Sequence, residues 1–156
     1  MDGTGVPKDY VDARGWCQKA AEQGLPAAQF NLGLMYQDGK GGSEDDRLAA
    51  SWYEKSAEQG SSRAQWRLGA FYRYGKGVPQ DYEKAVDWLT KAAEQGNVWA
   101  QVDLGELMEA GRGAKRDLVK AYVWFALATR QENVSPENHE RAARGLAATI
   151  ASQGVV

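Results

Sequence analysis

The sequence predicts an all-α solenoid, in which helix–loop–helix units of equal length stack in a row. Two observations predict it. The first is a strict period of 36 residues, which brings back a tryptophan at Trp16, Trp52, Trp88 and Trp124. The second is that apolar side chains within each unit recur at the spacing of one helix face. Because a single short helix pair cannot bury its apolar face alone, such units must stack on one another.

The composition argues against several functional classes. The chain has 19 basic and 21 acidic residues, a net charge of −2, which gives no electrostatic footprint for nucleic acid or an anionic membrane. No apolar run approaches the ~18 residues of a membrane-spanning helix. One cysteine cannot form an internal disulfide, and one histidine, His139, leaves little for a zinc site or a Ser-His-Asp triad. We therefore expect no cofactor, no metal and no catalytic residues.

The chain opens with a partial unit, residues 3–25. A loop, Gly3-Thr4-Gly5, leads directly into a helix that carries Trp16, and no first helix precedes it. Leaving a side chain of that size in water forfeits about 2–3 kcal/mol. Two explanations stay open: the chain is the C-terminal part of a longer protein, or the open face pairs with another copy.

Three complete units follow, at about residues 26–61, 62–97 and 98–132. The first helix of the middle unit should end near Gly75, because glycine alone adopts a left-handed conformation easily. An aspartate then stands where the N-cap of the second helix is expected. It recurs in every unit, as Asp9, Asp45, Asp81 and Asp117.

Two recurring positions of the second helices are expected to lie in the core. The tryptophan ladder predicts packing between units. Cys17 occupies the position that holds Tyr53, Leu89 and Phe125 in the later units, which predicts a buried, inert thiol.

The last helix should span residues 135–153. Ser135, Pro136 and Glu137 make a typical helix start, with a cap, a first-turn proline and an acidic residue. An apolar stripe then follows at Ala142, Leu146 and Ile150. Such a helix would cap the last repeat, as a solenoid requires.

The repeated motif resembles a known family. The pattern A-Q-x-x-L-G-x-x-Y-x-x-G-x-G, followed by D-x-x-x-A-x-x-W-x-x-x-A-A-E-Q-G, is similar to the Sel1-like repeat over roughly residues 3–131. The resemblance implies a right-handed α/α superhelix related to tetratricopeptide arrays, as a single domain over residues 1–156. One departure is Met108, which stands where Tyr36 and Tyr72 stand in the earlier units.

The resemblance also implies a function, that of a non-enzymatic protein–protein interaction module. Members of this family are mostly bacterial adaptors or scaffolds, common in envelopes and secretion-linked systems. Some are immunity proteins that neutralise secreted toxins, which is the sharper hypothesis here. The alternatives are a self-assembling envelope scaffold and, less favoured, a hydrolase of cell-wall or lactam substrates. The expected compartment is the periplasm if a signal peptide has been removed, and the cytoplasm otherwise.

Comparison of the repeats with one another indicates where a protein partner would bind. Positions that agree between repeats serve the fold, whereas positions that disagree are free to serve a target or are ordinary solvated variation. On the first helices the disagreeing positions fall on one stripe, which faces the concave side in related solenoids. The predicted partner-binding residues are Asn31, Leu34, Arg63, Arg67, Tyr74, Trp99, Asp103 and Glu106.

Charge also varies along the chain. Residues 43–60 carry a net charge of −3 and residues 109–130 a net charge of +3. Such a gradient would steer and orient an encounter with a partner.

Overall fold

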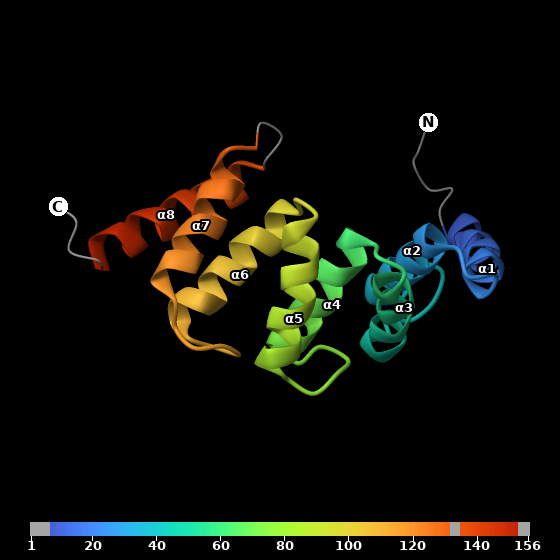
Figure 1. The fold of residues 1–156 in the computed structure, drawn as a ribbon. Helices are drawn as coiled ribbons and strands as arrows, with labels where there is room; N and C mark the ends of the chain where they lie inside the picture. Colours follow the sequence, from blue (N-terminus) through green and yellow to red (C-terminus); the bar gives the residue numbers. More distant parts are fainter. Residues whose placement is uncertain (1–6, 132–134, 153–156) are drawn as a thin grey trace. The chain divides into compact units, whose positions relative to one another are not determined.

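The computed structural model describes residues 7–131 and 135–152, and within these ranges it contains helices and no strand (Figure 1). The all-α fold is confirmed. The helices in the described ranges are α1 (Pro7–Glu22), α2 (Pro26–Gln37), α3 (Asp46–Glu58), α4 (Ser62–Tyr74), α5 (Tyr82–Glu94), α6 (Val98–Ala110), α7 (Leu118–Thr129) and α8 (Pro136–Ser152).

The chain divides into two compact units, Met1–Gln80 with α1 to α4 and Asp81–Val156 with α5 to α8. In the first unit each helix packs on the next one along the chain. In the second unit α5 packs on α6, α6 on α7 and α7 on α8, and α8 also contacts α6. The boundary falls between the two helices of the middle repeat. The single domain over residues 1–156 stays a prediction.

The repeat period is visible in where the helices begin. α2, α4 and α6 begin at Pro26, Ser62 and Val98, which are spaced by the period of the sequence. α4 and α6 end at Gly75 and Gly111, where φ is 69° and 66°. The predicted glycine stops are therefore confirmed, because these φ values lie in the left-handed region.

The predicted aspartate caps are confirmed in three of the four units. Asp45, Asp81 and Asp117 have extended backbones, and their side chains accept hydrogen bonds from backbone N–H groups of the first turn. Lys84 N donates to Asp81 Oδ1 over 3.0 Å, for example. The fourth aspartate is different: α1 begins two residues before Asp9, so Asp9 lies inside the first turn and is no N-cap.

A buried glutamine explains why the Ala-Gln pair recurs. Gln29 Nε2 donates to the carbonyl of Ala21 over 3.2 Å, and Gln65 Nε2 donates to the carbonyl of Ala57 over 3.1 Å. Gln101 makes the same bond to the preceding helix over 3.2 Å. Buried amides need such partners. This position therefore serves helix packing.

One position per repeat supplies the largest fully buried side chain of the second helices. Tyr53, Leu89 and Phe125 are fully buried. Tyr53 and Phe125 pack so closely on Gly33 and Gly105 of the neighbouring first helices that a Cβ at either glycine would clash with the ring. Phe125 also belongs to the apolar cluster that joins α6, α7 and α8.

The tryptophan ladder does not lie in this core, which corrects the prediction. Trp52, Trp88 and Trp124 are partly buried, and Trp16 is 70% exposed. A lysine from the next turn covers part of the ring instead: Lys55 Nζ lies 4.0 Å from the Trp52 ring centroid, and the same contact measures 4.1 Å one repeat later. Adjacent helix positions differ by about 100° in direction, so the residue after each tryptophan takes the core position.

Cys17, which lies on α1, is partly buried and not fully buried as predicted. Its Sγ donates to the carbonyl of Ala28 over 3.3 Å. Burial raises the pKa of the Cys17 thiol. The thiol form is therefore favoured, in keeping with the predicted low reactivity.

The predicted capping helix is α8. Asn138 N donates to Ser135 Oγ over 3.4 Å, as expected for an N-cap. Ala142 is buried as predicted, but the buried stripe continues through Thr149, while Ile150 is exposed. The prediction used apolar residues alone. Near the C-terminal end of α8, the side that packs on the neighbouring helices carries Thr149, one residue before Ile150.

Candidate functional site

Five of the predicted partner-binding residues lie in the first unit. Asn31 and Leu34 are on α2, and Arg63, Arg67 and Tyr74 are on α4. Asn31, Arg63 and Tyr74 are exposed, whereas Leu34 and Arg67 are partly buried. None of the five belongs to the buried core. Their burial agrees with the interpretation that the fold does not dictate their identity.

Both arginines of this group are held against aromatic rings. The Arg63 Cζ lies 4.7 Å from the ring centroid of Phe30, which comes from α2. The Arg67 Cζ lies 4.6 Å from the ring centroid of Trp66. Cation–π stacking fixes a guanidinium plane while leaving its N–H groups at the edge available to donate. The two positive charges stand one helical turn apart.

Arg67 carries a polar atom whose hydrogen-bonding capacity is unused. Its Nε is buried and has no hydrogen-bond partner among the described residues. Burial raises the pKa of the nearby Tyr53 hydroxyl, and the positive charge of Arg67 opposes that rise. The Tyr53 hydroxyl itself donates to Gln37 Oε1 over 2.6 Å. Unpaired buried donors are rare in native proteins, so this one calls for an explanation.

The other three predicted residues lie on α6 in the second unit. Trp99 is 43% exposed although it is an aromatic side chain, and the equivalent positions of the earlier repeats hold Ala27 and Arg63. Asp103, in contrast, is only 6% exposed, and Glu106 is partly buried. The three therefore differ in how much of each side chain another molecule could reach.

Asp103 and Glu106 are used to hold the capping helix. Arg141 Nη2 on α8 lies 2.8 Å from Asp103 Oδ1 and 2.9 Å from Glu106 Oε1, and Arg141 Nη1 donates to Asn138 Oδ1 over 3.3 Å. Burial alone would lower the pKa of Arg141, but hydrogen bonding to Asp103 and the two negative charges raise it overall. These contacts correct the reasoning that a position differing between repeats is free of the fold.

Sequence reasoning missed Arg141 because its partners are distant in the sequence. The residue lies 38 positions after Asp103, on a helix that has no counterpart in the repeats. The sequence did offer one signal. The position of Asp103 holds Asn31 and Arg67 in the earlier repeats and is acidic only in the last repeat, which the capping helix covers.

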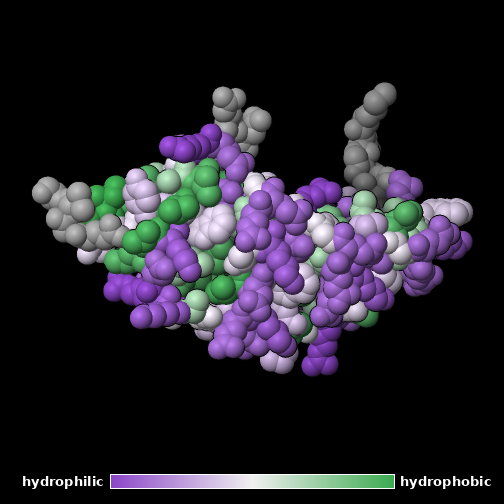
Figure 2. Space-filling view, in the orientation of Figure 1, coloured by the Kyte–Doolittle hydropathy of each residue, from purple (hydrophilic) through white to green (hydrophobic). Residues whose placement is uncertain are grey.

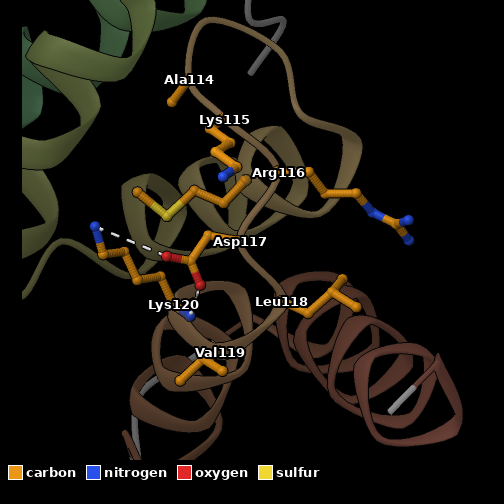
Figure 3. A pocket seen from close by; sticks show the side chains of 8 residues that line it. Ala114, Lys115, Arg116, Asp117, Leu118, Val119 and Lys120 are labelled. Atoms are coloured by element: carbon orange, nitrogen blue, oxygen red, sulfur yellow. Dashed lines mark hydrogen bonds and ion pairs between the residues drawn. The ribbon is translucent and has the colours of Figure 1, made fainter.

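The loop between α6 and α7 borders an open depression of about 610 Å³ (Figure 3). Asp117 points into it but is already engaged, because its Oδ1 caps α7 and its Oδ2 lies 3.8 Å from Lys120 Nζ. Arg116 points away from the other lining side chains and donates from Nε to the carbonyl of Glu109 over 2.9 Å. The depression is thus lined mainly by basic and apolar side chains, with no nucleophile–base pair among them.

Residues 7–131 and 135–152 hold no cluster of three or more His, Cys, Asp or Glu side chains suited to a metal ion. In the same part of the chain, every helix is too short or too polar to cross a bilayer.

The sequence pattern of the Sel1 repeat matches residues 1–25, 26–61, 62–97 and 100–133. None of the curated proteins matches the sequence. Several solved structures are also similar to this chain.

A Sel1 repeat protein from Oxalobacter formigenes shares 34% identity at a TM-score of 0.80, covering 92% of this chain and 55% of the other. A protective antigen of uropathogenic Escherichia coli strains, c5321, which displays an SLR fold, shares 36% identity at a TM-score of 0.77, covering 99% and 36%. The cysteine rich protein B of Helicobacter pylori shares 26% identity at a TM-score of 0.64, covering 88% and 97%. The chain thus spans about half of the first protein's length and about a third of the second's.

Proposed function

This chain belongs to the Sel1 repeat family, and from that premise we propose that it is an adaptor that binds another protein through the side chains of its first helices. Sel1 repeat proteins are generally protein–protein interaction modules, typically without enzymatic activity. Binding would use surfaces that the packed helices already hold in place, so little conformational entropy is lost on association.

The observation that carries this proposal is the pair of stacked arginines on α4. Arg63 and Arg67 make no ion pair with the other described residues of the first unit, and Arg63 is exposed while Arg67 is partly exposed. Guanidinium groups bind carboxylates through two parallel hydrogen bonds. The proposed surface is therefore completed by acidic side chains of a protein partner, with Asn31, Leu34 and Tyr74 around them.

Trp99 belongs to the proposal as an exposed aromatic of the second unit. Tryptophan, tyrosine and arginine dominate the energetics of protein interfaces. In this proposal Asp103 and Glu106 act indirectly. Their contacts with Arg141 of α8 hold α6, the helix that also carries Trp99, in place.

The experiment compares capture from the native lysate by three forms of the chain, followed by mass spectrometry. The forms are the wild type, Arg63→Ala/Arg67→Ala and the control Arg47→Ala, which removes an exposed arginine from α3. The double variant should lose the partner and raise the Kd by at least about tenfold, since each such truncation costs ~1–2 kcal/mol. Its melting temperature should match that of the control. A partner captured equally by all three forms would overturn the arginine surface.

A more specific proposal is that the partner is a secreted toxin which this chain neutralises. Its support is the family resemblance. The test is genomic and cellular. A gene for a toxic secreted lipase or nuclease should lie beside the gene for this chain. Co-expression of the wild-type chain with that toxin should restore cell growth, whereas co-expression of the Arg63→Ala/Arg67→Ala variant should not. A neighbourhood of envelope-assembly genes would favour a scaffold instead.

A second candidate function is self-assembly, favoured by the exposed apolar side chains of α1. Tyr10, Val11 and Trp16 are all exposed, Trp16 by 70%. Light scattering should then show a mass that rises with concentration in the wild type and falls to that of a monomer in Trp16→Asp. A wild type that stays monomeric at all concentrations would exclude this candidate.

A further inference from the structure

α7 presents an apolar ridge to solvent. Val119, Tyr122, Val123 and Leu127 are all exposed, from 64% for Val119 to 40% for Leu127. Their spacing of three, one and four residues places them along one face of the helix. Figure 2 shows hydrophobic residues gathered over the part of the molecule where Figure 1 places α7 and α8. We call these four residues the α7 ridge.

The repeat fold does not require this ridge. Three of its four positions are polar in the other complete repeats: Val119, Val123 and Leu127 correspond to Arg47, Ser51 and Lys55 on α3, and to Glu83, Asp87 and Lys91 on α5. The fourth, Tyr122, corresponds to the smaller apolar residues Ala50 and Val86. Among the complete repeats, apolar residues replace polar ones at those three positions in α7 alone. A patch of exposed apolar surface of this kind indicates an interaction site.

The capping helix does not cover the ridge. α8 packs on α7 through the opposite side of that helix, where Ala121, Phe125 and Ala128 are buried together with Ala142 of α8. The four residues of the α7 ridge lie on the side of α7 away from this cluster, and they remain exposed with the cap in place. Val119 also lines the depression beside the α6–α7 loop (Figure 3).

Positive charge surrounds the ridge and indicates the chemistry of its partner. Lys115 and Arg116 precede α7, and Lys120 and Arg130 lie at its two ends; all four are exposed. The one acidic residue among them, Asp117, is taken up by the N-cap of α7 and by Lys120. An isologous dimer would bring these cations against their own copies, which disfavours a second copy of this chain.

We propose that the α7 ridge is a second docking surface, which binds an acidic amphipathic helix of a protein partner. The ridge spans nine residues, a length of about 12 Å at 1.5 Å per residue, which suits the apolar face of a helix of two to three turns. Such a helix packs its apolar row against the ridge while its flanking glutamates or aspartates meet Lys115, Arg116 and Arg130. This surface is separate from the arginines of α4 and does not depend on the proposed function of α4.

The test uses a labelled 14-residue peptide with leucines at positions i, i+3, i+4 and i+7 and glutamates elsewhere, held helical by a hydrocarbon staple on the face opposite the leucines. A second peptide with lysines in place of the glutamates is the control. The full chain should bind the acidic peptide in a fluorescence anisotropy titration and should bind the basic peptide at least about tenfold more weakly, because like charges repel. Affinity for the acidic peptide should also fall as salt is added. Equal affinity for the two peptides, or no binding of either, would overturn the proposal.

The decisive variant transfers the α5 residues to α7, as Val119→Glu/Val123→Asp/Leu127→Lys. Because α5 folds with these residues, the variant should keep the circular dichroism and melting behaviour of the wild type while its Kd for the acidic peptide rises at least about tenfold. Unchanged affinity in the folded variant would overturn the proposal.

A second variant keeps the ridge and reverses the charge around it, as Lys115→Glu/Arg130→Glu. It should weaken binding at low salt and approach the wild type at high salt. The control Arg47→Glu changes an exposed arginine on α3 and should leave the affinity unchanged.

Two further measurements address other occupants. Vesicles of phosphatidylserine and phosphatidylcholine should not sediment with the chain, and light scattering should give the same mass for the wild type and the α5-transfer variant. Sedimentation with the vesicles that the transfer variant abolishes would replace the protein helix with a membrane surface. An oligomer that the transfer variant dissociates would replace it with a second copy of this chain.

Discussion

Removing Arg141 should destabilise the second unit by an amount that the contacts of its guanidinium determine. The side chain donates to Asp103 over 2.8 Å and to Glu106 over 2.9 Å and 3.1 Å. Breaking a fully buried ion pair by removing one partner costs about 3–5 kcal/mol. Only Asp103 is deeply buried here, while the side chains of Arg141 and Glu106 are 28% and 30% exposed. We therefore expect Arg141→Met to cost about 2–3 kcal/mol, below the full range.

Thermal and urea unfolding followed by circular dichroism measure this cost. A loss of that size lowers the melting temperature by about 4–12 °C, at 2–4 °C per kcal/mol for a chain of this length. The control is Arg144→Met, which removes an exposed arginine of the same helix whose ion pair with Glu140 is also exposed. It should change stability by less than about 0.5 kcal/mol.

A second substitution separates the charge effect from lost packing. Adding Asp103→Asn to Arg141→Met should recover part of the stability, because a neutral amide faces the methionine more cheaply than a buried carboxylate does. The reasoning is refuted if Arg141→Met is as stable as Arg144→Met, or if the double variant is no more stable than Arg141→Met.

Three further outcomes are expected. Gly77→Ala should lower stability by more than about 1 kcal/mol, since φ is 63° and a Cβ would clash with the backbone of Asp46; an unchanged urea midpoint would contradict this. Asp81→Ala should cost about 1 kcal/mol through loss of the α5 cap, measured in the same way. Burial raises the pKa of the Cys17 thiol, so alkylation by iodoacetamide should have its pH midpoint higher in the folded chain than in urea. Because the folded pKa is the higher one, the Cys17 thiol contributes its full share of stability below its unfolded pKa, and this share is lost as the pH rises through its folded pKa. Equal alkylation midpoints in the folded chain and in urea would refute both statements.

The candidate surface stays a prediction, but the structure shows which of its residues another molecule could reach. Arg63 and Tyr74 are exposed, as a partner-binding role requires. Asp103 is only 6% exposed, because a position that differs between repeats can also reflect a neighbour that only one repeat has. That neighbour is Arg141 of the capping helix. The capture experiment tests whether the exposed residues bind a partner.

The α7 ridge shows a limit of another kind. The apolar residues Val119, Val123 and Leu127 are plain in the sequence, but an apolar helix position is normally interpreted as core. Only the packing of α7 shows that Phe125 and its neighbours fill the buried face and that the ridge lies opposite.

The sequence by itself determined the helices, their period and their ends. Those features depend on interactions within a few residues, such as the Asp81 cap and the left-handed Gly75. Only the tertiary structure decided which side of each helix is buried. Trp52 and Tyr53 are both aromatic and adjacent, so their chemistry does not distinguish them, and the direction of the neighbouring helices places Tyr53 inside. Burial is set by residues distant along the chain, and no local pattern records where those residues will lie.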